Sequence, residues 1–188
     1  MSTEKNQSPS RGTEIVQFLI DLFEESERSV IITGVAKIES LIDELLFNYL
    51  RGRKSFKDKL FDFNGPLGTL SSKIKIAYAL KLIDKELYQT LEKLRDLRND
   101  FAHKLEAKTL STSNYKDKLN SKFDKSIDLI AFSHDSLIKF NAVRKKKEKI
   151  NPETLKFLSI LSAIMIVLES GNKFYEKKQI SIEATLTF

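Results

Sequence analysis

The stretch Glu27–Leu50, ERSVIITGVAKIESLIDELLFNYL, decides the fold class. Its apolar residues recur at intervals of three and four positions, which is the spacing of one face of an α-helix. The members of that stripe are Ile31, Val35, Ile38, Ile42, Leu45 and Tyr49. Gly52 follows the last of them, and glycine is common just beyond a helix end. The stretch therefore predicts a long helix with one face in a protein core.

The same helical spacing recurs on both sides of this segment. We expect helices over about 13–23, 27–50, 69–83, 84–105, 119–140 and 151–170, the last of them ending at Gly171. Between the second and third, residues 51–70 read as a long loop. That loop would be held down by its own apolar side chains, Phe56, Leu60, Phe61, Phe63 and Leu67.

The C-terminal residues differ, because Ile180, Ile182, Ala184, Leu186 and Phe188 alternate with polar residues as in a β-strand. A strand there would need a partner, either Leu105–Ser111 or a second subunit, and fraying is the other option. We predict an all-α fold, a single bundle of about six helices with a short C-terminal strand. Its domains would be a disordered tail at 1–12, the bundle at 13–175, and a tail or strand at 176–188.

The composition excludes several classes of protein. With 41% hydrophobic and 31% charged residues the chain is typical of a globular domain. There is no Cys and there are two His residues, so we expect no metal site, and the sequence holds no cofactor-binding fingerprint. The longest apolar run, Phe157–Leu168, is short of the roughly 20 residues that span a bilayer. With a polar N-terminus as well, we expect a cytoplasmic protein without a membrane segment.

The net charge of +6 raises the question of nucleic-acid binding. Part of the excess lies in two clusters, 51–59 and 144–149. The residues that would contact nucleic acid are Arg51, Arg53, Lys54, Lys145, Lys146 and Lys147. Neither cluster interleaves several basic residues with aromatic ones, as a single-strand binding groove would. Solvated loop charges are the favoured interpretation.

Arg98 is the most unusual residue in the expected helices. It falls within a stripe formed by Leu87, Leu91, Leu94, Phe101 and Leu105, where a charge is costly unless it is paired. In one interpretation Arg98 pairs with Glu39 or Asp43 on the second helix. In the other, Arg98, Asn99 and His103 form a metal-free site in which His103 transfers protons and Arg98 stabilises a phosphate. A two-fold axis could bring two copies of this helix to one cleft.

Three segments in residues 64–103 resemble the mannitol operon repressor family. They are NGPLGTLSSKIKIAYAL at 64–80, LIDKELY at 82–88 and RDLRNDFAH at 95–103. The resemblance implies an all-α bundle and a role in regulating sugar-uptake genes. The sequence shows no helix-turn-helix with a basic recognition helix, so we do not expect direct reading of an operator. We expect a non-enzymatic regulator that acts through a protein partner and forms a homodimer.

A second resemblance is to the HEPN superfamily (higher eukaryotes and prokaryotes nucleotide-binding). Its ribonucleases carry an arginine, an adjacent polar residue and a histidine after four intervening residues, and Arg98, Asn99 and His103 fit that pattern. This resemblance implies a dimeric, metal-independent endoribonuclease with an RNA substrate. There, Arg98 would hold the scissile phosphate, His103 would move protons, and Asn99 would orient His103. Whether the chain is an enzyme thus stays open at this point.

Overall fold

The structure is a computed structural model that describes residues 11–103, 109–122, 128–143 and 150–185. Over these residues every regular element is an α-helix. Their bounds are α1 Arg11–Leu22, α2 Glu27–Tyr49, α3 Lys54–Phe61, α4 Leu70–Ala79, α5 Lys85–His103, α6 Ser113–Asn120, α7 Asp128–Val143 and α8 Pro152–Thr185. The predicted all-α class is confirmed, with eight helices in the described residues rather than about six.

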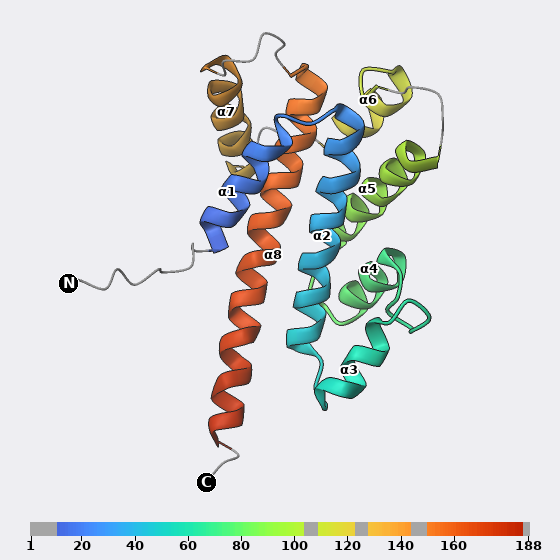
Figure 1. Ribbon diagram of the computed structural model, residues 1–188, viewed down its shortest axis with the longest axis vertical. Coiled ribbons are helices and arrows are strands. Elements are labelled where there is room, and N and C mark those ends of the chain that lie inside the picture. The colour runs from blue at the N-terminus through green and yellow to red at the C-terminus, as the bar shows by residue number, and fades with distance from the viewer. Residues whose placement is uncertain (1–10, 104–108, 123–127, 144–149, 186–188) are drawn as a thin grey trace, which may run out of the picture.

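Helices α2 and α8 form the central pair of the bundle and run side by side (Figure 1). Helices α1 and α7 pack against α8, whereas α4 and α5 pack against α2. Gly34 lets α2 approach α8 closely, because a β-carbon at that position would lie 2.8 Å from Leu161 Cδ2. The predicted α2 stripe is the one that faces this contact, since Ile31, Val35 and Ile38 are all buried.

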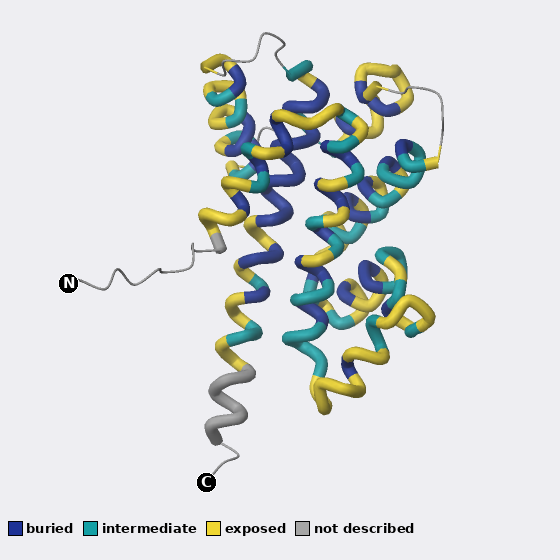
Figure 2. Tube along the Cα trace, viewed as in Figure 1, coloured by how far each residue is buried: buried dark blue, intermediate teal, exposed yellow. Residues whose placement is uncertain are grey.

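The core runs along the α2–α8 pair, where Figure 2 shows the buried residues concentrated. Within α8, the stretch Pro152–Lys178 is long and apolar enough to cross a membrane by length and composition. However, 72% of its apolar window is buried inside the bundle, as in the core helix of a globular protein. The interior position of α8 therefore accounts for its apolar sequence without a bilayer.

The C-terminal region differs from the prediction. Helix α8 does not end at Gly171 but continues to Thr185, so the strand expected from Ile180 onward is wrong as far as residue 185. Residues 186–188 lie outside the described part. A helix satisfies its backbone groups internally, whereas a lone strand leaves them unpaired. Asn172 Nδ2 also donates a 3.2 Å hydrogen bond to Leu41 O, which holds α8 against α2 beyond the glycine.

In two other regions the expected boundaries between helices and loops are wrong. The expected loop at 51–70 contains α3. The helix expected at 119–140 corresponds mainly to α7, and α6 lies before it, overlapping the expected range only at 119–120. The loop is anchored by Leu67, which is 5% exposed, but Phe56 and Phe63 point into solvent instead of packing. The expected strand partner, Leu105–Ser111, lies partly outside the described residues. In the described residues 109–111 it is not a strand.

Candidate functional site

Arg98 lies at the edge of the buried stripe of α5 rather than within it. Leu94, Leu97 and Phe101 take the inward positions, spaced three and four residues apart, and all three are buried. Arg98 is half-buried beside them, and its Nη1 donates a 3.1 Å hydrogen bond to Asn99 Oδ1. The stripe expected from the sequence did not include Leu97. Because Leu97 is buried, the buried face of α5 is turned away from the expected stripe, and Arg98 lies at its edge.

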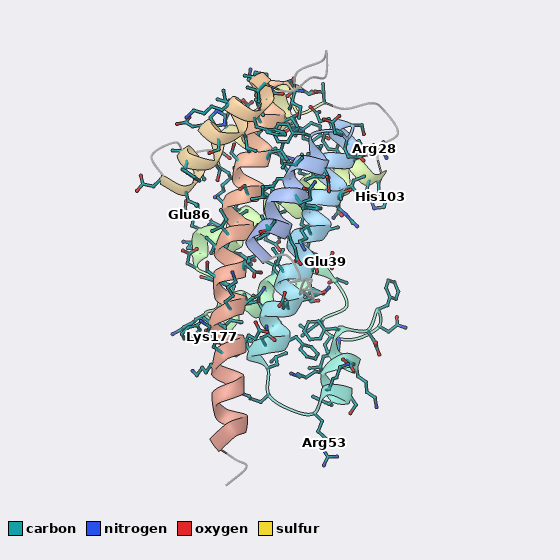
Figure 3. All side chains as sticks on the ribbon, turned by 60° about the vertical axis from the view of Figure 1, so that its left-hand side comes forward. Arg28, Glu39, Arg53, Glu86, His103 and Lys177 are labelled. Carbon is teal, nitrogen blue, oxygen red and sulfur yellow. The ribbon has the colours of Figure 1, made fainter. Side chains whose placement is uncertain are left out.

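His103 is the last residue of α5 and is exposed. Next to it, Arg28 Nη2 donates a 3.0 Å hydrogen bond to Ala102 O. Figure 3 shows Arg28 and His103 at the same end of the molecule. Arg28 thus caps the C-terminal end of α5, where free carbonyl groups favour a cation. Among the described residues, no interaction joins Arg98 to His103.

Glu39 and Asp43 bind Lys73, not Arg98. Lys73 Nζ lies 2.8 Å from Glu39 Oε1 and 2.8 Å from Asp43 Oδ1, and the lysine side chain is 7% exposed. The pairing expected for Arg98 is therefore replaced by one between α2 and α4. Lys73 stands between Leu70 and Ala77 on the inner face of α4, so the spacing rule that singled out Arg98 would also have found it.

Burial raises the pKa of the Asp43 carboxyl group, more than the hydrogen bond from Lys73 lowers it. For Lys73, burial by itself would lower the pKa, but the hydrogen bonds to Asp43 and Glu39 together outweigh it. The pKa of Lys73 is therefore raised above its ordinary value of 10.5. Lys73 stays charged at neutral pH, and the ion pair links α2 to α4.

Arg95 joins α5 to α4 by a second polar network. Its Nη2 lies 2.7 Å from Asp96 Oδ1, and its Nη1 lies 2.8 Å from both Glu92 Oε2 and Ser71 Oγ. The hydrogen bond to Asp96 is the main reason that the pKa of Arg95 is raised. Sequence reasoning missed this network, because i,i+3 charge pairs on a helix are common and their partners on other helices cannot be read from spacing.

The expected basic contacts are only partly assembled. Arg51 and Arg53 are exposed, and Figure 3 shows Arg53 pointing away from the bundle, far from His103. Lys54 Nζ instead lies 3.0 Å from Asp58 Oδ2 on the same helix. Lys145, Lys146 and Lys147 lie outside the described residues. In the described part of the chain no cluster of three or more His, Asp or Glu residues could hold a metal ion.

Two hollows mark the surface away from Arg98 and His103. One, between α2 and α3, has a volume of about 420 Å³, and we call it the α2–α3 cleft. It is lined by Asp43, Glu44, Phe47, Asp58, Phe61 and Asp62. The other, of about 500 Å³, is an apolar groove between α1, α7 and α8 whose lining has no charged residue. Val16 and Phe132 stand on its sides, 55% and 69% exposed.

Comparison with known protein families identifies the family of this chain. A sequence model of the family described as "Mannitol repressor" matches residues 21–149. The chain belongs to the mannitol repressor family. The match takes in α2 to α7, and with them Lys73, Arg95 and the Arg98–His103 segment. The polar links of α2, α4 and α5 thus lie within the part of the chain that the mannitol repressor family model matches.

Individual relatives agree with this assignment. The mannitol operon repressor of Escherichia coli strain K12 is 32% identical over 80 residues, which are 40% of this chain and 41% of that protein. The same protein of E. coli O6:H1 gives equal figures. The chain thus spans about two fifths of the length of these relatives.

The fold also agrees with a solved structure, described as the MtlR-HPr complex from Escherichia coli. Its TM-score is 0.56 at 18% identity, and the likeness covers 85% of this chain and 98% of that one. At this level of identity the likeness establishes the mannitol repressor fold. It extends beyond the 129 residues of the family match, and so reaches helices outside that match.

Proposed function

We propose that this member of the mannitol repressor family regulates gene expression through protein contacts, with no enzymatic step. The observation that supports this most directly is the family match over residues 21–149. The solved structure with the same fold is of a relative bound to a protein, HPr. We therefore propose the HPr protein of the same cell as the partner, and cytoplasm as the place where they meet.

The helix that carries the basic cluster at 51–59 does not present its lysines as a DNA-recognition helix would, and this supports an indirect action on DNA. A recognition helix presents several cations on one exposed face to the phosphate backbone and the base edges. In α3, Lys57 is buried and its ammonium group donates to Phe47 O at 3.0 Å, while Lys54 pairs with Asp58. Two of the three lysines of α3 are therefore engaged within the protein, and Lys59 is exposed.

The homodimer stays a prediction of this proposal. The apolar groove between α1, α7 and α8 is the surface that would suit it, because uncharged apolar area is typical of subunit contacts. Light scattering on the purified chain tests it directly. A dimer mass that becomes a monomer mass in Val16→Asp/Phe132→Asp would support self-association through the groove, and a monomer mass in the wild type would refute it.

Two binding measurements test the main proposal. Calorimetric titration of purified HPr from the same organism into the chain should give saturable one-to-one binding. A mobility-shift assay with the protein alone on its own operon promoter should show no sequence-specific complex. A tight and specific shift that disappears with added salt would replace the indirect mechanism by direct DNA binding.

A further inference from the structure

Phe63 lies in a closely packed turn and is exposed to solvent. Its side chain is 88% exposed, although the neighbouring Leu67 is buried. A β-carbon on Gly65 would lie 2.5 Å from the carbonyl oxygens of Lys59 and Leu60, and one on Gly68 would collide with the carbonyl oxygen of Phe63. Leu67 N also donates a 2.8 Å hydrogen bond to Leu60 O. The backbone of this turn therefore leaves no room for a side chain at Gly65 or Gly68, and the Phe63 ring lies outside the core.

Asp62, the residue before Phe63, is one of the residues that line the α2–α3 cleft. Asp58 from α3 and Asp43 and Glu44 from α2 line it as well. Two aromatic rings, Phe47 and Phe61, complete the lining, with their centroids 6.0 Å apart. The exposed Phe63 thus directly follows, in sequence, a residue of a recess that combines carboxylates with aromatic faces.

The charge balance of this surface is opposite to that of the chain. Five carboxylates lie in or beside the cleft, those of Glu39, Asp43, Glu44, Asp58 and Asp62. Three ammonium groups accompany them: Lys73 binds Glu39 and Asp43, and Lys54 binds Asp58. The third, Lys57, lies 3.9 Å above the centre of the Phe47 ring. Within the part of the chain that the structure describes, the lining of the cleft itself holds four carboxylates and no basic residue, on a chain whose net charge is +6.

We propose that Phe63 and the α2–α3 cleft form the docking surface for a partner protein that presents an arginine flanked by apolar residues. The guanidinium group would enter between Asp58 and Asp62 and stack on the ring of Phe61. The ring of Phe63 would enter an apolar recess of the partner. This rests on the proposed action through protein contacts, and it adds the chemistry of the partner's surface.

Arginine fits this recess better than other cations. Its planar group accepts two carboxylates in a fork geometry and also stacks on aromatic faces, whereas an ammonium group is more strongly hydrated. Aromatic residues such as Phe63 are enriched at the centres of protein interfaces, where they supply large apolar area at a small entropic cost. The surface therefore combines an apolar anchor with a charge-selective pocket.

Nuclear magnetic resonance with two short peptides tests the surface without knowledge of the natural partner. The probes are acetyl-Leu-Arg-Leu-Arg-amide and the matched peptide with glutamate in place of arginine. The arginine peptide should shift the amide signals of Glu44, Asp58 and Phe63, and the glutamate peptide should not. Signals that move mainly on other helices, or equally for both peptides, would refute the proposal.

Variants make the test quantitative. Asp58→Asn/Asp62→Asn and, separately, Phe63→Ala should weaken binding of the arginine peptide by about fivefold, as for partly exposed contacts. Matched controls change the same chemistry elsewhere: Glu14→Gln/Glu25→Gln on exposed sites and Phe174→Ala on α8. The controls should bind as the wild type does. Because all substituted residues are exposed, thermal unfolding should be unchanged and will show that each variant is folded.

The same samples titrated with HPr separate this proposal from the proposed function. If HPr binds the wild type and the arginine peptide shows no preference for the cleft, the docking surface is wrong and the partner proposal stands. If the peptide binds at the cleft and HPr does not bind at all, the surface stands and the named partner is wrong.

Discussion

Glu27 accepts a 2.7 Å hydrogen bond from Asn151, a residue 124 positions further along the chain. The same carboxylate accepts hydrogen bonds from Leu110 N at 2.6 Å and from Thr154 Oγ1 at 2.7 Å. One side chain therefore ties the first turn of α2 to the start of α8 and to the segment before α6. These hydrogen bonds lie at the end of the bundle where α5 also ends.

Replacement of Glu27 by alanine should destabilise the whole bundle. Hydrogen bonds to a charged group contribute about 1.5–3 kcal/mol each, but three bonds that share one acceptor are not additive. We expect the free energy of unfolding in urea to fall by about 3 kcal/mol. Glu25→Ala, two residues earlier and exposed, is the control and should change it by less than about 0.5 kcal/mol. Equal losses in the two variants would contradict the role of Glu27.

Lys73→Met should lower stability because it leaves Glu39 and Asp43 facing each other without a cation. Loss of one partner of a fully buried ion pair costs about 3–5 kcal/mol. Here the two carboxylates are 29% and 37% exposed, so water can solvate them in part, and we expect about 2 kcal/mol. The triple change Lys73→Met/Glu39→Gln/Asp43→Asn should recover most of the loss. If it does not, packing around Lys73 matters more than its charge.

The contribution of Lys73 should depend on pH in a defined direction. Its pKa is raised in the folded state above 10.5, so the stabilisation is fully present below about pH 10.5 and is lost as the pH rises through the folded value. The difference in unfolding free energy between the wild type and Lys73→Met should therefore shrink in alkaline buffer. Asp43 contributes in the acid range. Burial raises the pKa of its carboxyl group in the folded state, so the folded chain holds this proton more tightly than the unfolded chain does. That contribution to stability is present at low pH and is lost as the pH rises through the folded pKa. A constant difference up to pH 12 would show that the ion pair adds nothing.

Two glycines in the central helices should respond differently to alanine. In Gly34→Ala the new β-carbon would lie 2.8 Å from Leu161 Cδ2, inside a fully buried contact. We expect a loss of about 1 kcal/mol, because overpacking outweighs the gain in helix propensity. In Gly171→Ala the nearest atom, Leu45 Cδ1, is 3.2 Å away, and the two effects should nearly cancel. Thermal unfolding of both variants is the measurement, and a reversed order would refute the close approach of α2 to α8.

The Arg98–His103 segment should not cleave RNA. Arg98 is bound to Asn99, and His103 is exposed at the end of α5. Total RNA incubated with the protein in the presence of a chelator should stay intact, for the wild type and for Arg98→Ala and His103→Ala alike. Cleavage by the wild type that both substitutions abolish would establish the ribonuclease that the motif suggests.

The sequence predicted the elements whose pattern is local. The stripe from Ile31 to Tyr49 predicted α2 almost to the residue, and the helix expected from residue 69 begins at Leu70 with Thr69 as its N-cap. A period of 3.6 and a cap both depend on neighbours within one turn. The C-terminal alternation predicted a strand for the same reason, but the state of Ile180–Thr185 depends on α8 as a whole, which a short window does not show.

Partners across helices could not be predicted in this way. Glu39 and Asp43 were expected as partners of Arg98, but the cation that binds them is Lys73, from a helix of which only the spacing was known. Which of two basic residues reaches a carboxylate depends on how two helices cross. Leu97 is buried although the expected stripe left it out, and Arg98 lies at the edge of that face, where it binds Asn99.

The central α2–α8 pair also constrains how the chain can be made. Helix α2 is complete at Tyr49, but the helix that covers its inner face begins at Pro152. At a synthesis rate of about 5–20 residues per second, the ribosome needs roughly 5–20 seconds to reach that point. During this interval, α4 and α5 can pack on one side of α2 while the other side stays apolar and uncovered. Synthesis of the last helix therefore sets the earliest moment at which the apolar face of α2 can be covered.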